Sequence, residues 1–339
     1  MKAGIFYGPK DIKMEDVEKP EIQDNEILIN VKACGICGSD LHLYKLNMFS
    51  LILLKPTKKG GIPGHEFSGV VVKVGKSVKD IKEGDRVVAF NNGGMAEYVS
   101  VPYVSGFNII QIPPELSFEE AATLEPISNS YHAMMKGNPT KGDNVVIFGA
   151  GCIGLGIIQC LRALEIDINK IIVVDLSDYR LKVAKELGAD EVINASKDHP
   201  LTKINQLVEL VPLELMPAMK VPKVDIIYDC VGYMKQHEGP AVLQHAINLA
   251  FPKTGRIVVH GIFESDVKLN LLPMIGKQIV IKGSYGFERE EVEKCIELMA
   301  FKNIDMSKLI SHEFPLEQIK EAFETQCNTG ESVKVLIKP

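Results

Sequence analysis

The chain has 339 residues, which is more than a single hydrophobic core usually supports and suits two domains. Its composition, with 46% hydrophobic and 24% charged residues, excludes disorder, a collagen-like repeat and a disulfide scaffold. The net charge of −6 argues against nucleic acid as a partner, because binding of phosphate groups requires a basic surface.

The cysteines and the N-terminal residues bear on the compartment. Seven cysteines are an odd, scattered set, which fits a reducing compartment or metal ligation better than a disulfide framework. Residues 1–13 alternate polar and apolar side chains, and no run reaches the roughly 20 uncharged apolar residues that cross a bilayer. We therefore expect a cytoplasmic protein with neither a nucleic-acid nor a membrane partner.

The first part of the chain has the pattern of a β-rich domain. Short runs rich in Val and Ile are separated by turn residues such as Gly84-Asp85 and Asn92-Gly93. The predicted strands are Glu26–Lys32, Phe67–Val74, Arg86–Phe90 and Ala96–Pro102.

From about residue 141 the pattern changes to strands that alternate with helices. The predicted strands are Asn144–Phe148, Lys170–Val174, Val224–Cys230, Arg256–His260 and Gln278–Lys282, and the first helices are Ile153–Leu164 and Asp178–Gly188. This alternation indicates α/β architecture, with a doubly wound parallel sheet covered by helices on both faces.

The end of the chain returns to the first domain. An amphipathic helix is predicted at Glu288–Ala300 and a final Val/Ile strand at Ser332–Lys338. This tail is too short for a core of its own, so we expect it to pack on the β-rich domain. The predicted domains are residues 1–138 with 287–339, and residues 139–286. The segment Leu207–Lys223, with three prolines, is interpreted as a connection that carries an insertion.

A glycine-rich turn, Gly-Ala-Gly-Cys-Ile-Gly at residues 149–154, follows the first strand of the second domain. In this GxGxxG spacing, Gly149 allows a tight turn, Gly151 lets a pyrophosphate approach the backbone, and Gly154 lets helix and strand pack closely. The helix opens inside the motif, at Ile153, and directs its positive dipole end at the phosphates. The motif predicts a dinucleotide-binding site.

An acidic residue stands where such a site needs one. Asp175 lies 21 positions after Gly154 at the end of an apolar strand, where its carboxylate can accept hydrogen bonds from both adenosine ribose hydroxyls. Because a carboxylate there repels the 2′-phosphate of NADP, the expected cofactor is NAD. Arg180 is placed to cover the adenine.

A second cluster contains candidate metal ligands. Cys34 and Cys37 form a CxxC pair, which suggests a structural zinc or a redox pair, but a closed four-sulfur site needs a second such pair. Cys37, His65 and a carboxylate would instead form a three-ligand zinc site with one open position. Open zinc sites are catalytic and can polarise an alkoxide or carbonyl oxygen.

These residues match a known family. Gly64-His65-Glu66, then Gly69, Gly75 and Val78, is the signature of zinc-containing alcohol dehydrogenases of the medium-chain dehydrogenase superfamily. The runs at residues 34–40, 84–87 and 125–127 and the glycine motif occur in the family's order, so the resemblance extends from about Lys2 to Ile337. Within the family, the chain resembles the polyol (sorbitol or xylitol) and 2,3-butanediol dehydrogenases, with threonine dehydrogenase nearby. The resemblance implies a GroES-like β-rich catalytic domain and a Rossmann NAD-binding domain.

The resemblance also implies the ligands of the metal. Cys37 and His65 match zinc ligands, and Glu66 follows His65 as a ligand or a closely coupled neighbour. Glu125 stands where polyol enzymes carry a glutamate, bound directly or through water. The choice between Glu66 and Glu125 as the direct third ligand stays open.

The same resemblance implies a proton path and a cofactor pocket. Ser39 matches the hydroxyl that takes the proton from the substrate alcohol, and His42 matches the relay that passes it out. Asp40 would orient His65. Segments that match cofactor-binding residues of this branch are His260-Gly261-Ile262 and Ser284-Tyr285-Gly286.

One departure concerns the metal content. Most relatives carry four clustered cysteines after the Gly-Asp-Arg-Val run and hold a second, structural zinc there. Between Arg86 and Glu97 this chain has no cysteine. We expect one catalytic zinc per chain and no structural zinc.

The resulting hypothesis is zinc-assisted transfer of a hydride from a secondary alcohol or polyol to NAD. The alternatives are an L-threonine 3-dehydrogenase, a sugar or phosphorylated-polyol dehydrogenase, a zinc-free quinone or enone reductase, and an NAD-binding protein without turnover. The segment Leu43–Gly61 is apolar at its centre and lines the pocket or covers a subunit interface. If it lines the pocket, butanediol is favoured over a hexitol. The expected assembly is a homodimer or homotetramer.

Overall fold

The computed structural model describes residues 1–53, 60–105, 107–213, 217–234 and 239–339. It divides into two compact units: residues 1–127 with 289–339, and residues 128–288. Among the described residues, no helix is both long and apolar enough to cross a membrane.

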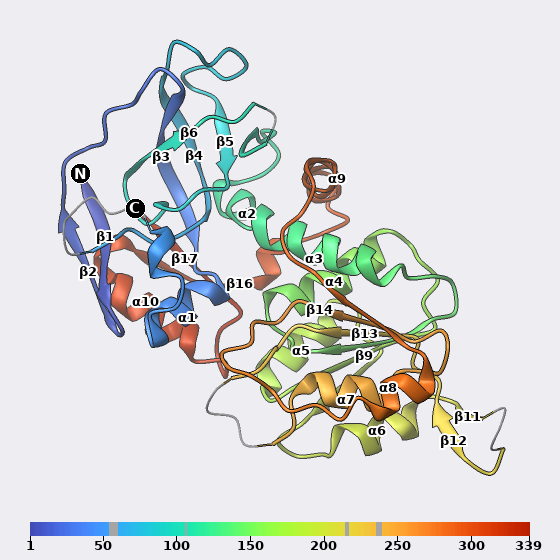
Figure 1. The fold of residues 1–339 in the computed structure, drawn as a ribbon. Coiled ribbons are helices and arrows are strands. Elements are labelled where there is room, and N and C mark those ends of the chain that lie inside the picture. The colour runs from blue at the N-terminus through green and yellow to red at the C-terminus, as the bar shows by residue number, and fades with distance from the viewer. Residues whose placement is uncertain (54–59, 106, 214–216, 235–238) are drawn as a thin grey trace. The chain divides into compact units, whose positions relative to one another are not determined.

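The first unit is built on a seven-stranded sheet (Figure 1). Its strands follow the order β16-β17-β3-β4-β5-β7, and β6 pairs with β3 as well. Their bounds are β3 Glu26–Gly35, β4 Glu66–Val74, β5 Arg86–Ala89, β6 Tyr98–Pro102, β7 Ile109–Gln111, β16 Ile310–Pro315 and β17 Lys334–Lys338. A hairpin of β1 (Lys2–Gly8) and β2 (Asp11–Asp16) packs on the same core.

Short helices complete this unit. They are α1 Gly38–Leu46, η1 Ser50–Ile52, α2 Phe118–Ala122, α9 Arg289–Ala300, η2 Met306–Leu309, η3 Leu316–Gln318 and α10 Ile319–Cys327. The end of the chain joins the sheet because β17 pairs antiparallel with β3, next to the start of α1. This confirms that the tail packs on the β-rich domain.

The second unit is a six-stranded parallel sheet in the order β10-β9-β8-β13-β14-β15. The strands are β8 Asn144–Phe148, β9 Lys170–Asp175, β10 Glu191–Asn194, β13 Ile226–Asp229, β14 Arg256–Val259 and β15 Val280–Gly283. The central strands β8, β9 and β13 are almost wholly buried, as their continuous Val/Ile runs predict. Strand order and direction confirm the doubly wound, Rossmann-like arrangement.

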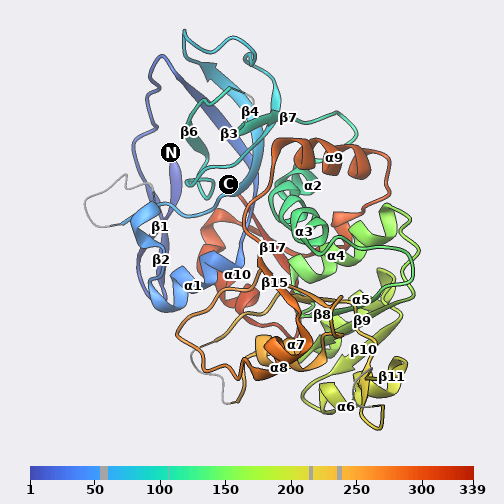
Figure 2. The same cartoon turned by 45° about the vertical axis from the view of Figure 1, so that its right-hand side comes forward.

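Helices cover both faces of this sheet (Figure 2). Their bounds are α3 Leu124–Gly137, α4 Cys152–Ala163, α5 Asp178–Glu186, α6 Pro200–Leu207, α7 Val242–Leu249 and α8 Leu272–Lys277. Helices α4 and α5 lie on one face, and α7 and α8 on the other. The predicted insertion contains a small hairpin of β11 (Leu210–Pro212) and β12 (Lys220–Pro222), while its residues 214–216 lie outside the described residues.

The boundary between the units falls inside α3, before the position at residue 138 that the change of pattern suggested. The reason is that the second half of α3 packs against the parallel sheet. The buried Tyr228 hydroxyl on β13 donates to the carbonyl of Met134 at 2.8 Å, and Gly137 packs against the same ring. The helix is therefore shared by the two units.

Candidate metal centre and cofactor-binding site

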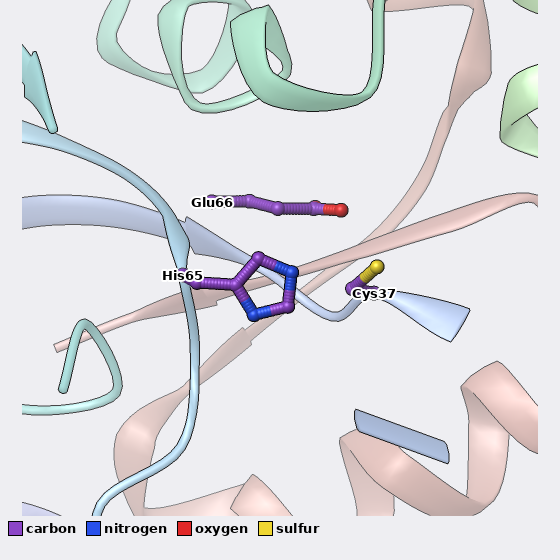
Figure 3. Close-up of side chains that lie close together, drawn as sticks. All are labelled: Cys37, His65 and Glu66. Atoms are coloured by element: carbon purple, nitrogen blue, oxygen red, sulfur yellow. The ribbon is translucent and has the colours of Figure 1, made fainter. Parts of the chain in front are cut away.

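Cys37, His65 and Glu66 come together at one end of the β3–β4 pair. Strand β3 ends at Gly35, directly opposite Glu66, the first residue of β4. Cys37 follows β3 as the N-cap residue of α1, and His65 immediately precedes β4. One potential ligand atom from each of the three side chains lies within 4.8 Å of the others, and Figure 3 shows them directed at a common space.

This donor set fits zinc. Thiolate, imidazole and carboxylate are zinc ligands, and three protein ligands leave one coordination position for a substrate. Tetrahedral bonds of about 2.0–2.3 Å require ligand atoms about 3.3–3.8 Å apart. Small side-chain movements from the present separations would meet this requirement.

Two glycines allow this close approach of the backbone. A Cβ on Gly35 would come within 2.1 Å of a Glu66 carboxylate oxygen. Gly64 has φ +90°, and a Cβ there would lie 2.6 Å from the Cys34 sulfur. Side chains at either position would push His65 and Glu66 away from Cys37.

A lysine from the end of the chain neutralises Glu66. Lys334 Nζ, on β17, donates to the two Glu66 carboxylate oxygens at 2.6 and 3.0 Å and to the Ile36 carbonyl at 3.0 Å. Both side chains are buried, with Glu66 0% and Lys334 2% exposed. Removing one partner of such a pair leaves an uncompensated charge in the interior. Lys334 was not among the residues predicted from the sequence, although a lysine within an apolar terminal strand was a detectable signal.

Asp40 is fixed to the same turn. Its carboxylate accepts a hydrogen bond from the backbone N–H of Cys37 at 2.9 Å, so it holds the start of α1 in place. Asp40 is also close enough to His65 for the imidazole to act on its pKa, although burial is the stronger effect and raises that pKa. Ser39 and His42 are half-buried on α1.

Charge is concentrated at this centre. Burial raises the pKa of the Cys37 thiol, and the nearby Glu66 carboxylate raises it further. Burial lowers the pKa of His65, but Cys37, Asp40 and Glu125 outweigh it and raise that pKa well above its ordinary value. Glu125 is half-buried in the first turn of α3 and lies outside the three-residue ligand group. Its charge nevertheless contributes to raising the pKa of both Cys37 and His65.

The glycine motif of the second unit has the geometry that its spacing predicts. Gly149 has φ +95°, and Gly151 is the N-cap residue of α4. A Cβ on Gly154 would lie 1.9 Å from the Gly149 carbonyl oxygen, so only glycine permits this contact between helix and turn. Ile153 is half-buried in the first turn of α4.

Asp175 is locked to this turn. Its Oδ2 accepts a hydrogen bond from the N–H of Ala150 at 2.7 Å, and its Oδ1 accepts one from Ser177 at 2.8 Å. The turn that would bind a pyrophosphate therefore also orients the carboxylate that would bind a ribose. The Arg180 guanidinium lies near Gly151, with Nη1 3.9 Å from a Cβ built there. Burial lowers its pKa, and the charge of Asp175 acts in the opposite direction.

The remaining predicted cofactor residues lie at the same, carboxyl edge of the sheet. His260, Gly261 and Ile262 follow β14, and the residues 284–286 follow β15. His260 Nδ1 lies 3.3 Å from the Ser284 hydroxyl, while Tyr285 is 96% exposed. In open α/β sheets, this edge is where ligands bind.

One part of this edge was not predicted from the sequence. The loop after β13, residues 230–232, packs between the turn at Gly149 and the loop at Gly261. A Cβ on Gly149 would lie 2.8 Å from Val231 Cγ2, and one on Gly261 would lie 2.0 Å from the Gly232 nitrogen. The Asp229-Cys230-Val231-Gly232 run at the end of an apolar strand was its only signal in the sequence.

The segment between Cys37 and His65 is only partly described. Leu54 and the residues up to 59 lie outside the described residues. Before them, Phe49 is 43% and Leu51 90% exposed, so neither belongs to the core of this unit. Within the described part, Phe49 and Leu51 thus lie at the surface of the first unit, whereas Leu53 packs against its core.

Comparisons with known proteins identify the family of the chain. The family described as zinc-binding dehydrogenase matches residues 152–300, and the alcohol dehydrogenase GroES-like domain matches residues 23–114. L-idonate 5-dehydrogenase of Vitis vinifera is 31% identical over 98% of this chain and 93% of its own length. Sorbitol dehydrogenase of Homo sapiens is 31% identical over 98% of this chain and 94% of its own.

Solved structures give the same result. The crystal structure of 2R,3R-butanediol dehydrogenase from Bacillus subtilis superposes with a TM-score of 0.83 at 29% identity, covering 100% of this chain and 99% of that one. Similarity therefore extends over the whole length of relatives whose names share one chemistry. The chain belongs to the zinc-binding alcohol dehydrogenase family, in the branch of the sorbitol, L-idonate and butanediol dehydrogenases.

Proposed function

We propose that this protein oxidises a secondary alcohol or polyol with NAD as hydride acceptor, at a zinc ion held by Cys37, His65 and Glu66. The observation that carries the proposal is the convergence of these three side chains in a chain that is related over its full length to polyol and butanediol dehydrogenases. When bound, zinc supplies Lewis-acid polarisation of the substrate oxygen, and NAD accepts the hydride.

The chain's own residues manage the proton. The Ser39 hydroxyl takes the proton of the substrate alcohol, and the His42 imidazole passes it to solvent. Both are half-buried on α1, the helix whose N-cap residue is Cys37, and this location supports the assignment. Asp40 keeps that helix start rigid through its bond to the Cys37 N–H.

Glu66 is proposed as the direct third ligand. A carboxylate has about four lone-pair sites on two oxygens, so Glu66 can bind the metal and keep a hydrogen bond to Lys334. Lys334 then offsets one of the negative charges that Cys37, Glu66 and Glu125 gather around the ion. Glu125 acts beside the ion, directly or through water.

We further propose one zinc per chain and no structural zinc. The cysteines other than Cys34 and Cys37 are at positions 152, 160, 230, 295 and 327, and the described residues contain one group of three potential ligands. We expect NAD to be preferred to NADP because the Asp175 carboxylate is held beside the glycine turn, where it would meet the ribose of a bound cofactor. Seven free thiols favour a reducing, cytoplasmic location.

A homo-oligomer is proposed on the surface of the second unit. Strand β15 is the edge of the six-stranded sheet, and Val280 on it is 45% exposed. In the adjoining α8, Leu272 is 72% and Ile275 67% exposed. An edge strand beside exposed apolar side chains favours pairing with a second copy of the chain.

The test measures formation of NADH by the zinc-loaded protein with sorbitol, xylitol, L-idonate, 2,3-butanediol, threonine and simple secondary alcohols. The same substrates are then tried with NADP, and formation of NADPH is measured. We expect preference for one polyol or diol class, loss on chelation, restoration by zinc, and weak use of NADP. Metal analysis should find one zinc per chain.

Cys37→Ala should lower turnover more than about 100-fold, because losing even a group that orients a ligand costs 10–100-fold. The matched control is Cys34→Ala near the end of β3, which should keep both zinc and activity. Equal loss in both variants would favour a site built from the CxxC pair. Turnover that resists both chelation and Cys37→Ala would overturn the zinc role.

A further inference from the structure

Asp229 is a buried acidic residue at the carboxyl edge of the six-stranded sheet. It is the last residue of β13, between the ends of β8 and β14, with Phe148 and Val259 as its neighbours in register. Its side chain is 0% exposed. Among the described residues, its Oδ2 has no hydrogen-bond partner. Burying a carboxylate oxygen without a hydrogen-bond partner is energetically unfavourable. The hydrogen bonds made by the other oxygen must therefore offset this cost.

The bonded oxygen holds the loop at residues 230–232, hereafter the central loop. Oδ1 accepts hydrogen bonds from the N–H of Val231 at 3.1 Å and of Gly232 at 2.9 Å. The main-chain carbonyl of Asp229 accepts two more, from His260 and Gly261, both at 2.9 Å. One residue thus ties together the loops that follow β13 and β14.

The central loop has no free space on either side. Gly232 has φ +72°, and a Cβ on it would lie 2.1 Å from the carbonyl oxygen of Ile262. Val231 Cγ2 would lie 2.8 Å from a Cβ on Gly149. Gly149, Gly261 and Ile262 are all among the predicted cofactor residues. A shift of the central loop would therefore displace both the pyrophosphate turn and the loop after β14.

We propose that Asp229 is the positioning residue of the dinucleotide site: its carboxylate fixes the central loop, and the central loop keeps the turn at Gly149 and the loop at Gly261 in the form that binds NAD. The proposal rests on the proposed use of NAD. It is independent of the zinc site and of the identity of the alcohol.

The test measures NADH affinity of the full-length protein by fluorescence titration, with the melting temperature and steady-state kinetics of each variant. Asp229→Ala removes both loop bonds and should raise the NADH Kd and the NAD KM at least tenfold, with kcat at saturating NAD within threefold. Asp229→Asn keeps an acceptor oxygen for Val231 and Gly232 and should restore affinity to within threefold of the parent.

Asp225 provides a matched control. It is 3% exposed, immediately precedes the same strand, and accepts hydrogen bonds from the Asn144 N–H at 2.9 Å and from Lys223 Nζ, but at the opposite edge of the sheet. Asp225→Ala should lower the melting temperature and leave the NADH Kd within threefold. Gly232→Ala, which displaces the central loop without touching the carboxylate, should reproduce the weak binding even if Asp229→Ala does not fold.

Several outcomes would overturn the inference. Asp229→Ala with parental affinity would show that the loop bonds are dispensable, and Asp229→Asn as weak as Asp229→Ala would show that the acceptor oxygen is not what matters. Weakening by Asp225→Ala to the same extent would reduce the effect to general stability. If the parent protein itself does not bind NADH, the proposed cofactor fails first, and titration of the parent alone reveals this.

Discussion

Burial shifts the pKa values of Asp229 and His260 in opposite directions. Burial raises the pKa of Asp229 to about 6, against the lowering effect of its bonds to Gly232 and Val231. Burial lowers the pKa of His260 to about 4, assisted by the nearby His132. Near pH 5 the folded protein therefore keeps Asp229 protonated and His260 neutral, while the unfolded chain has both groups charged. The number of bound protons is nearly the same in the two states.

This balance gives a prediction for pH dependence. Raising the pH from 4 to 6 removes stability at Asp229, whose folded pKa lies above the ordinary value, and adds stability at His260, whose folded pKa lies below it. Asp229→Asn should leave the His260 effect uncompensated, so the variant should gain about 2–3 kcal/mol relative to the parent between pH 4 and 7.

The measurement is denaturant unfolding of both proteins without cofactor at several pH values. His260→Asn serves as the opposite control, because it should lose stability relative to the parent over the same range. Parallel pH curves for Asp229→Asn and the parent would refute the assigned shift.

At the scale of residues, motifs made of neighbouring residues could be recognised from the sequence. Contacts between residues far apart in the chain could not. The glycine motif, Asp175 and the pair His65-Glu66 are local patterns, so the order of residues alone was enough to propose them as site residues. Lys334 lies 268 positions after Glu66 in the chain, and no local sequence pattern predicts their contact. Asp229 was predicted only as part of a strand, because its loop contacts come from three separate strand ends.

Helix α4 and strand β8 carry the turn on which the proposed dinucleotide site depends. The helix reaches its position because Gly154 lies against the Gly149 carbonyl. Gly154→Ala should push the helix N-terminus away from the turn, weaken NADH binding by more than about tenfold and lower stability by about 1–3 kcal/mol, as overpacking of a close contact does.

Gly276 in α8 offers a matched comparison. A Cβ there would meet nothing within 4 Å, so Gly276→Ala should keep NADH affinity and hold or slightly raise the melting temperature. Calorimetric titration with NADH and thermal melts of both variants distinguish the two sites. Parental affinity in Gly154→Ala would mean that the helix position is not critical.

Most strands of the second unit were predictable because they are apolar runs bounded by Gly or Asp, whereas β10, Glu191–Asn194, was not predicted. The predicted strand Asn144–Phe148 coincides with β8. The hairpin of β11 and β12 was not predicted, since three-residue strands containing proline have little β-propensity and are defined by their pairing with each other. The extent of α3 across both units likewise depends on tertiary contacts such as that of Tyr228.

For the whole molecule, the exposed edge at β15 predicts self-association. We expect a dimer or tetramer by size-exclusion chromatography with light scattering, and a smaller species for the double variant Ile275→Glu, Val280→Glu, because buried charges would oppose pairing. Met219, 53% exposed beside β12, gives the control variant Met219→Glu, which should keep the parental mass. A monomeric parent protein, or a double variant of unchanged mass, would rule out this surface.

The contact between β17 and the metal centre also has a consequence for the order of events during synthesis. Cys37, His65 and Glu66 are translated well before Lys334, which lies 268 positions after Glu66. Because nascent chains fold progressively from the N-terminus, the Glu66 carboxylate has no lysine partner until β17 has been synthesised. At the proposed site, a zinc ion captured in that interval would meet an unshared carboxylate, and one captured later would compete with the ammonium group of Lys334. We therefore expect zinc loading to depend on whether the ion arrives before or after β17 pairs with β3.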